Sequence, residues 1–420
     1  MRVAIIGGGV SGLVTGYRLH EKHSVTLFEA NDYIGGHTNT IDVENEEGHF
    51  AIDTGFIVFN DRTYPNFIAL MDELKVASQP TQMSFSVSCE KTGLEYRGAD
   101  FSGLFAQRRN LVNPRFLRLL LDLVRFNKAG EKLLESEQEN ETVAEFFERN
   151  HFSSQFIEQY FLPMGAAIWS ASFDTFKKFP IRFIAEFYQN HGLLGVTNRP
   201  QWRVITGGSR QYIEPLTRDW VDQIHTKQPI IGVQRTDNGV TVLSKDGKSH
   251  PFDHVVFACH SDQALRILGE QASLNETEIL SAFPYHPNTA LLHTQESVLP
   301  KNKRAWACWN YFKPKQASSV ANVTYNMNIL QSIRSQRTFC VTLNDDGRIQ
   351  DENILGSYTY MHPTFEIRRK QMQARHRELI NTNNTSFCGA YWGNGFHEDG
   401  VKSAIAVAEE LESIDAGVRC

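Results

Sequence analysis

A glycine-rich loop close to the N-terminus constrains the fold of this chain more than any other feature. Residues 2–6 form a short apolar run, and glycines follow it in the spacing GxGxxG. The first glycine permits a tight turn, the second lets the backbone approach a pyrophosphate, and the third lets the next helix pack against the strand. We expect a helix over residues 11–20 whose amides and dipole face those phosphates. The predicted contacts are Gly7, Gly9, Val10, Ser11 and Gly12.

An acidic residue at the end of the second apolar run defines the nucleotide further. Glu29 lies about 20 residues beyond the central glycine, where an acid accepts hydrogen bonds from a ribose and repels the extra phosphate of NADP. Glu29 and the neighbouring Ala30 are therefore predicted to bind an unphosphorylated adenosine. FAD and NAD share this half, so the loop and the acid leave both cofactors open.

A double glycine just beyond this acid narrows the choice. Residues 35–38 read Gly-Gly-His-Thr, and residues 52–56 read Ile-Asp-Thr-Gly-Phe. In this order the motifs resemble those of the superfamily of flavin amine oxidases, protoporphyrinogen oxidases and phytoene desaturases. The resemblance implies that the double glycine passes close under the cofactor and that residues 52–56 bring backbone near the flavin ring. Many members have arginine where this chain has histidine. The residues implied to bind are Gly35, Gly36, His37, Thr38, Gly55 and Phe56.

A third glycine motif near the C-terminus completes the resemblance. We predict a strand and a turn over residues 386–389, and apolar spacing predicts a helix over 401–411. In the family, the start of this helix stabilises negative charge on the reduced flavin. The family's usual acid after the glycine is replaced here by Ala390. The resemblance implies noncovalent FAD, because no cysteine has the context used for covalent attachment. It adds the cofactor contacts Val233, Gly389, Glu398, Asp399, Gly400 and Val401.

The cofactor motifs lie far apart, which predicts a domain assembled from separated segments. The expected fold class is α/β, with a Rossmann-like FAD-binding domain of the glutathione-reductase type and an α+β substrate domain. The predicted FAD-binding domain comprises residues 1–60, 200–265 and 380–420, with hairpins from residue 229 onward. The predicted substrate domain comprises a helical part, 61–199, and an antiparallel sheet part, 266–379. Strands of that sheet are expected at 289–293, 304–312, 319–325 and 338–343.

Charge and cysteine usage limit the partners. The net charge of −6 argues against nucleic acid. The six cysteines are scattered without a CxxC pair, so neither a metal site nor a disulfide framework is signalled. A reducing, cytoplasmic compartment fits best. No apolar stretch has the length needed to span a bilayer, and the sequence does not define the oligomeric state.

A basic segment stands out within this acidic chain. Residues 101–132 hold seven lysines and arginines among many apolar residues, against only Asp122 and Glu131. A basic helix with a wide apolar face can lie in the headgroup region of an anionic membrane, which would place the protein peripherally at the inner membrane surface. It can equally be a helix that packs on the core with its arginines in solvent. The same two alternatives hold for Phe173, Phe176, Phe179, Phe183 and Phe187, which could line an apolar tunnel or fill a core.

The flavin carries the redox step, so few catalytic groups are expected from the protein. Tyr391 and Trp392 lie where the family places residues close to the flavin, and they are the predicted catalytic residues. A second dinucleotide fingerprint is absent, which predicts reoxidation by oxygen or an electron carrier. Weaker candidates, each of which a structural role explains better, are His37, Trp309, Asn310, His362 and His397.

Three functional hypotheses remain open. Residues 163–170, 256–265 and 360–363 resemble a subgroup of predicted flavoproteins that are similar to the oxidase-like region fused to some cyclopropane-fatty-acid synthases. This favours an FAD-dependent oxidoreductase, of the oxidase, dehydrogenase or desaturase type, that takes a hydride from a lipid acyl chain. The first alternative is a flavin amine oxidase of small amines or polyamines. The second is a flavin-binding partner of a lipid-modifying enzyme, without turnover of its own.

Overall fold

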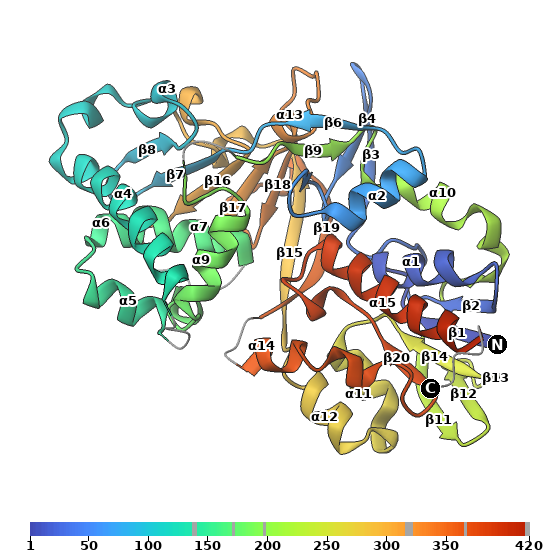
Figure 1. The fold of residues 1–420 in the computed structure, drawn as a ribbon. Coiled ribbons are helices and arrows are strands. Elements are labelled where there is room, and N and C mark those ends of the chain that lie inside the picture. The colour runs from blue at the N-terminus through green and yellow to red at the C-terminus, as the bar shows by residue number, and fades with distance from the viewer. Residues whose placement is uncertain (137–140, 170–172, 196–198, 316–321, 365–367, 416–420) are drawn as a thin grey trace.

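The computed structural model describes residues 1–136, 141–169, 173–195, 199–315, 322–364 and 368–415 (Figure 1). The first and last helices lie together on the right of Figure 1, beside both ends of the chain. The helices α3 to α9 gather on the left, and two long strands, β15 and β19, run down the middle. Segments from both ends of the sequence therefore build one half of the molecule.

The half that contains the termini is built on a parallel sheet. Its strands are β1 (Arg2–Ile6), β2 (Ser24–Phe28), β10 (Ile224–His225), β14 (His254–Phe257) and β20 (Thr385–Phe387), in the order β10-β2-β1-β14-β20. The strand β1 lies inside this sheet and is buried from its second residue onward, as expected for an apolar run covered on both faces. The helices α1 (Val10–Leu19) and α15 (His397–Asp415) pack on one face through a shared apolar core.

A small antiparallel meander and two helices cover the other face of the parallel sheet. The strands are β11 (Ile230–Thr236), β12 (Gly239–Ser244) and β13 (Ser249–Phe252), with tight turns at the predicted positions. The helices α11 (Ser261–Leu268) and α12 (Leu274–Leu280) share an apolar core with the meander and with β14. The predicted hairpins from residue 229 are confirmed.

A mixed sheet forms the other half. Its order is β19-β15-β18-β17-β16-β7-β8, comprising β19 (Ile354–Pro363), β15 (Tyr285–His293), β18 (Cys340–Leu343), β17 (Asn322–Asn326), β16 (Trp309–Lys313), β7 (Phe85–Cys89) and β8 (Leu94–Arg97). The strands from the predicted sheet part, 266–379, pair antiparallel with one another. The predicted helical part, 61–199, also contributes β7 and β8 to this sheet, and β7 pairs in parallel with β16. The predicted strand at 304–312 begins only at Trp309, since Lys303–Ala305 form a 3-10 turn. Residues 319–321 of another predicted strand lie outside the described residues.

Two short sheets connect the halves. One is the hairpin of β3 (Thr40–Asn45) and β4 (Gly48–Asp53). The other is a three-stranded sheet in the order β5-β9-β6, made of β5 (Phe59–Asn60), β9 (Trp202–Ile205) and β6 (Ser78–Thr81). Four further helices follow strands of the short sheets or of the mixed sheet in the chain: α2 (Pro65–Glu73) after β5, α10 (Ile213–Thr217) after β9, α13 (Met327–Leu330) after β17 and α14 (Arg368–Gln373) after β19. The division of the chain into two domains with the predicted boundaries stays a prediction.

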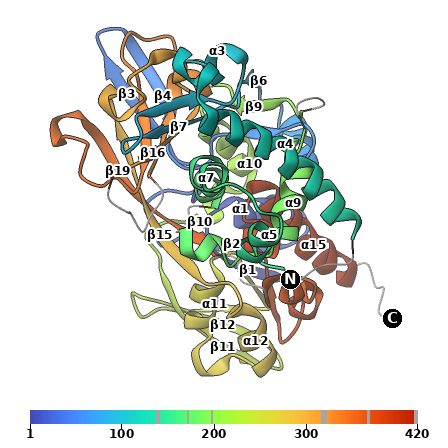
Figure 2. The ribbon, with the colours of Figure 1, turned by 90° about the vertical axis from the view of Figure 1, so that its left-hand side faces the viewer.

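The remaining helices lie together (Figure 2), and those from α4 to α9 enclose a separate aromatic core. They are α3 (Phe101–Leu104), α4 (Pro114–Glu135), α5 (Val143–Arg149), α6 (Ser154–Phe156), α7 (Leu162–Trp169), α8 (Phe173–Phe176) and α9 (Ile181–Asn190). Phe176, Phe179 and Phe187 are buried in this core and Phe183 packs against it, so the core interpretation holds for them. The side chain of Phe173 lies outside the described residues.

The basic segment is not one continuous helix. Residues Arg108–Val112 form a 3-10 turn between α3 and α4, and Asn113 caps α4 by accepting hydrogen bonds from Arg115 N and Phe116 N. Pro114 follows at the first helical position, which suits its fixed φ and missing N–H. None of the helices in the described ranges combines the length and the apolar character that crossing a membrane requires.

Candidate functional site

The glycine loop after β1 is fixed to Glu29 by a hydrogen bond. Gly8 N donates to Glu29 Oε2 at 2.7 Å, and Asn31 N donates to Glu29 Oε1 at 2.8 Å. Each carboxylate oxygen can accept a further hydrogen bond, so Glu29 retains acceptor capacity for a ribose hydroxyl. At Gly12 a Cβ would fall 1.9 Å from Gly7 O, so only glycine lets α1 start this close to the strand.

The double glycine lies directly against this loop. Gly35 N donates to Gly8 O at 2.7 Å, and Gly36 has a φ of +60°, which favours glycine. A Cβ on Gly36 would lie 3.1 Å from the Cα of Gly9. Apart from Gly9 itself and its two chain neighbours, no described residue has an atom within 4 Å of the place where a Cβ on Gly9 would be. The first two predicted motifs therefore meet and leave open space above the central glycine.

The start of α15 packs on the start of α1. A Cβ on Gly400 would lie 2.8 Å from Val10 Cγ1 and 2.9 Å from Ser11 Oγ. The first-turn amides of a helix have no partner within the helix, and two such helix ends converge here. The third predicted motif thus joins the first, and the three motifs form one site.

The acids at the start of α15 have structural partners. Glu398 accepts hydrogen bonds from Asn66 N, Asn66 Nδ2 and Phe67 N, and so caps α2. Asp399 Oδ2 accepts from Asn394 N and Phe396 N, each at 2.9 Å. Burial raises the pKa of Asp399 to about 6. The two carboxylates therefore shape the loop and the helix end.

The backbone hydrogen bonds at the start of α15 limit which of its amides can contact a cofactor. Phe396 O accepts from Asp399 N and Gly400 N, and Val401 is buried in the core. The amides of His397 and Glu398 remain at the open first turn. Any amide contact from this helix to a ligand falls to those two residues, and His397 was predicted only as a weak candidate.

A hydrogen-bonded group links the second motif to α15. Thr38 Oγ1 contacts Tyr212 Oη and lies 3.0 Å from His397 Nε2. The ring of Phe56 stacks on that of His397 with centroids 3.6 Å apart. Burial lowers the pKa of His397 well below its ordinary value. The predicted residues Thr38 and Phe56 therefore lie in the site, and they orient His397.

A cluster of uncharged rings lies next to the double glycine. The His37 ring centroid is 5.0 Å from that of Tyr360, 5.5 Å from that of His362 and 6.4 Å from that of His260. We call His37, His260, His362 and Tyr360 the histidine cluster. Sequence analysis named His37 and His362 and missed the other two, which only tertiary packing brings here.

The imidazoles of the histidine cluster are neutral at pH 7. Burial, and then the neighbouring imidazole, lowers the pKa of His37 and of His260 to about 4, and that of His362 to about 3. Asn288 Nδ2 donates to His362 Nδ1 at 2.9 Å, and Asn288 Oδ1 accepts from Asn344 Nδ2. Neutral His362 therefore carries its proton on Nε2 and can act as a hydrogen-bond donor.

The predicted catalytic residues Tyr391 and Trp392 lie within packed aromatic surroundings. Tyr391 is 2% exposed and packs on Phe283, and Trp392 stacks on His376 with centroids 4.1 Å apart. Gly389 N donates to Ser403 Oγ, and that hydroxyl donates to Gly389 O, which ties the turn before Tyr391 to α15. Both aromatic residues have structural contacts, and their catalytic role stays a prediction.

Other predicted residues fall into the framework around the site. Trp309 packs on Tyr325, and the side chain of Asn310 is fully used by Ser86, Ala307 and Thr324. Both are structural. At Gly55 a Cβ would lie 2.2 Å from His37 O, and Val233 is buried in the meander. Ala30 follows Glu29 at the end of β2.

A buried carboxylate that the sequence did not reveal holds the hairpin after the double glycine. Asp53 Oδ1 accepts from Thr40 Oγ1, Ser209 N and Ser209 Oγ, and Asp53 Oδ2 accepts from Gln331 Nε2. Burial raises the pKa of Asp53 to about 6. The signal in the sequence was the acid within Ile52–Phe56, but two of its partners, Ser209 and Gln331, lie more than 150 residues away.

The arrangement fits a dinucleotide cofactor. Open space above Gly9, two converging helix ends and an acid with free acceptor capacity match a pyrophosphate and a ribose. The imidazoles of the histidine cluster beyond the double glycine are neutral and half-buried, which suits a flat, uncharged ring system and an apolar substrate.

Comparison with known proteins supports this description. A family model described as "Flavin containing amine oxidoreductase" matches residues 10–322. A 1-hydroxycarotenoid 3,4-desaturase of Flavobacterium sp. (strain P99-3) is 33% identical over 96 residues, which are 23% of this chain and 18% of that protein. This chain matches only part of each of three curated relatives, between 18% and 51% of the relative's length.

Solved structures share the fold over almost the whole chain. Cyclohexylamine oxidase from Brevibacterium oxydans IH-35A has a TM-score of 0.70 and 17% identity, covering 98% of this chain and 99% of that one. A fatty acid isomerase of P. acnes has a TM-score of 0.65 and 16% identity, covering 98% of each chain. The predicted α/β fold class is confirmed.

Proposed function

The chain belongs to the flavin containing amine oxidoreductase family, and we propose that it is an FAD-dependent oxidoreductase that takes a hydride from a lipid acyl chain. The cofactor is FAD, which supplies the hydride acceptor when it is bound. The protein binds the cofactor, orients the substrate against it and keeps water out.

The residues proposed to hold FAD come from the three motifs. Glu29 accepts a ribose hydroxyl with the lone pairs that Gly8 N and Asn31 N leave free. The open side of Gly9 and the first-turn amides of α1 take the pyrophosphate. The first-turn amides of His397 and Glu398 face the flavin end. Thr38 and Phe56 hold the ring of His397 in place.

The neutrality of the histidine cluster is the observation that favours an acyl chain. All three imidazoles have a lowered pKa, and no carboxylate is among the causes. A cationic ammonium group would lose its hydration here without gaining a counter-charge, whereas an alkyl chain has no such cost. The resemblance of residues 163–170, 256–265 and 360–363 to flavoproteins similar to the oxidase-like region fused to some cyclopropane-fatty-acid synthases also favours an acyl chain. A neighbour of the same fold is a fatty acid isomerase.

An amine substrate is the second candidate. Tyr360 and His37 present two rings side by side, and aromatic rings can hold an amine through their faces. A neighbour of the same fold is a cyclohexylamine oxidase. The fold is therefore compatible with both substrate classes, and we expect the side chains of the histidine cluster to determine which substrate is bound.

Anaerobic flavin bleaching tests the proposal. Purified protein loaded with FAD is mixed without oxygen with phospholipid or fatty acyl compounds, and separately with mono- and polyamines. We expect bleaching with acyl compounds, and a return of the colour with oxygen or an electron carrier. Bleaching by amines alone would overturn the lipid substrate. A photoreduced cofactor that no acceptor reoxidises would indicate the non-catalytic partner of a lipid-modifying enzyme.

A further inference from the structure

We propose that residues 101–128 form a docking surface for an anionic lipid bilayer. Six large hydrophobic residues in this segment are exposed, namely Phe101, Leu111, Val112, Leu117, Leu121 and Val124. The remaining exposed large hydrophobics of the described chain are scattered over other elements. Contiguous exposed apolar residues mark interaction sites, whereas single ones need no explanation.

Helix geometry makes these residues one surface. Leu117, Leu121 and Val124 follow each other at spacings of four and three, so they form a stripe along the outer side of α4. Leu111 and Val112 lie in the turn just before this helix. The ring centroid of Phe101 is 4.7 Å from that of Phe105, which is 5.9 Å from that of Phe116, so α3 is held against the first turn of α4 beside the stripe. The same helix buries Phe116, Leu119 and Phe126 on its other side, so the outer stripe is not needed for the core.

The charge around this stripe determines the partner. Arg108, Arg115 and Lys128 are exposed, and residues 101–128 hold six lysines and arginines in a chain whose net charge is −6. Arg118 and Arg125 also point outward, with side chains about half exposed, although both pair with the buried Asp122. An apolar stripe with cations nearby matches the headgroup region of a membrane that contains anionic lipid. There the attraction between opposite charges and the burial of apolar side chains both contribute to the free energy of binding.

This surface does not rest on the proposed substrate. It would bring the enzyme to its substrate if that substrate is a membrane lipid, but vesicle binding can be measured without turnover. Failure of vesicle binding and failure of lipid oxidation are therefore separate results.

Vesicle cosedimentation of the FAD-loaded protein tests the surface. We expect binding to vesicles of phosphatidylcholine mixed with phosphatidylglycerol, and much weaker binding to phosphatidylcholine alone. Raising the salt concentration from about 0.1 M to about 1 M shortens the screening length from about 10 Å to about 3 Å and should release the protein partially. Equal binding to both vesicle types, or none to either, would overturn the proposal.

Two variants address the two parts of the surface. Arg115→Glu with Lys128→Glu should weaken binding at least about 25-fold, since each cation near an anionic surface contributes about fivefold. Leu121→Glu with Val124→Glu should weaken binding at least about tenfold by removing apolar burial. Arg118 and Arg125 are left intact, because each forms an ion pair with the buried Asp122, and replacing either one would remove a counter-charge of this carboxylate.

The matched control carries the same kinds of change elsewhere. Leu274→Glu lies at the exposed start of α12, and Lys402→Glu lies on the exposed side of α15. This double variant should bind vesicles as the wild type does. Flavin content and thermal unfolding confirm that all variants are folded. If the control loses binding as strongly as the surface variants, or if the surface variants bind like wild type, the assignment of this surface is wrong.

Discussion

Among single residues, Glu29 combines a structural function with a proposed binding function. It fixes the glycine loop by accepting from Gly8 N, and it is the group proposed to accept the ribose hydroxyl. It is 8% exposed, so its carboxylate is well shielded from solvent. Hydrogen bonds to a charged acceptor contribute more than neutral ones.

Replacing this acid should cost most of the cofactor affinity. Glu29→Arg removes the acceptor of the hydrogen bond from Gly8 N and of the proposed hydrogen bond from the ribose hydroxyl, and it introduces a positive charge beside the loop. Each hydrogen bond to a charged group contributes about 1.5–3 kcal/mol, so the dissociation constant for FAD should rise by about 10-fold to 100-fold or more. Fluorescence titration of apoprotein measures this. Glu21→Arg, at an exposed turn, should keep the wild-type value, and an unchanged constant for Glu29→Arg would contradict the placement of the adenosine.

The histidine cluster predicts a pH dependence of stability. His362 has a pKa of about 3 in the folded protein, below its ordinary value of about 6.5. The unfolded chain binds the proton more readily, so the stabilisation is present above pH 6.5 and is lost as the pH falls toward 3. Each such group adds a slope of about 1.4 kcal/mol per pH unit in this window.

The variant His362→Gln should therefore show a shallower loss of stability between pH 6.5 and 4.5. Urea unfolding at several pH values gives the free energy of unfolding. Buried carboxylates with a raised pKa, such as Asp53 and Asp399, act in the opposite direction but are the same in both proteins, so they cancel in the difference. The exposed His286→Gln serves as control. Parallel curves for wild type and His362→Gln would show that His362 is not held neutral.

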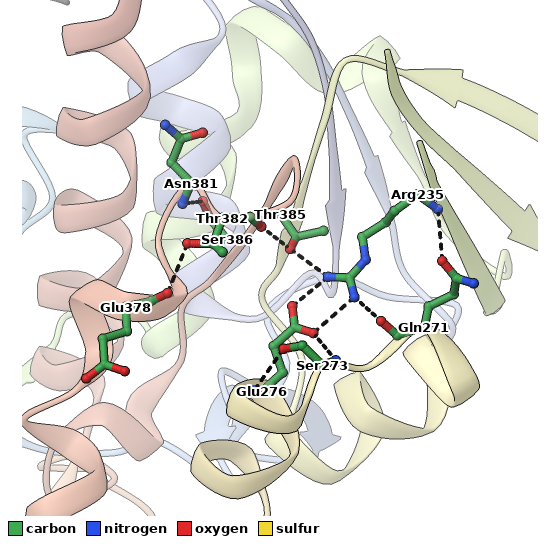
Figure 3. A network of polar contacts seen from close by, with 9 residues as sticks. All are labelled: Arg235, Gln271, Ser273, Glu276, Glu378, Asn381, Thr382, Thr385 and Ser386. Carbon is green, nitrogen blue, oxygen red and sulfur yellow. Dashed lines mark hydrogen bonds and ion pairs between the residues drawn. The ribbon is translucent and has the colours of Figure 1, made fainter. Parts of the chain in front are cut away.

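Among the secondary-structure elements, a buried ion pair joins the meander to α12, and its arginine also reaches the parallel sheet (Figure 3). Arg235 on β11 pairs with Glu276 of α12 at 2.5 Å and donates to Thr385 Oγ1 of β20 at 3.3 Å. The side chains are 9% and 1% exposed. Glu276 also accepts from Ser273 N, which closes the capping box at the start of α12. Three separate elements thus meet at one guanidinium group.

Breaking this pair from one side should destabilise the protein strongly. Arg235→Met leaves the carboxylate of Glu276 buried without its counter-charge, at a cost of about 3–5 kcal/mol. The double variant Arg235→Met with Glu276→Leu should recover much of that loss. Arg266→Met breaks an exposed pair with Asp262 and should change stability by less than about 1 kcal/mol. Urea unfolding that shows no difference between Arg235→Met and Arg266→Met would refute the structural role of the buried pair.

The strand, glycine loop, helix and acid were predictable because steric limits act within a few residues. At Gly12 only glycine avoids Gly7 O, and the apolar spacing of α15 is visible along the chain. The parallel pairing of Phe85 with Trp309 was not predictable, because nothing local fixes a contact between residues so far apart. The same holds for His260 and Tyr360, whose place in the site depends on the packing of strands from both halves.

In the whole molecule, the cofactor site exists only when both ends of the chain are folded together. The loop after β1, the double glycine and the start of α15 contact one another, although almost 400 residues separate the first from the last. A ligand that bridges these segments binds the folded state and not the unfolded chain. Its free energy of binding is therefore added to the stability of the fold.

Cofactor binding should raise the thermal stability of the apoprotein. With free FAD at about 100 times its dissociation constant, the expected gain is about 2.7 kcal/mol. Differential scanning calorimetry of apoprotein with and without FAD measures the shift. NADPH at the same concentration should have little effect, because Glu29 repels the extra phosphate. A larger shift with NADPH than with FAD would point to a different nucleotide in this site.

The visible spectrum of the purified protein, followed by release of the cofactor on denaturation, decides whether the three motifs hold a flavin. We expect a yellow protein that releases one FAD per chain. If the protein is purified without its cofactor and is colourless, added FAD should restore the flavin spectrum. A protein that remains colourless with FAD in excess, or that releases a nicotinamide nucleotide instead, would contradict the account.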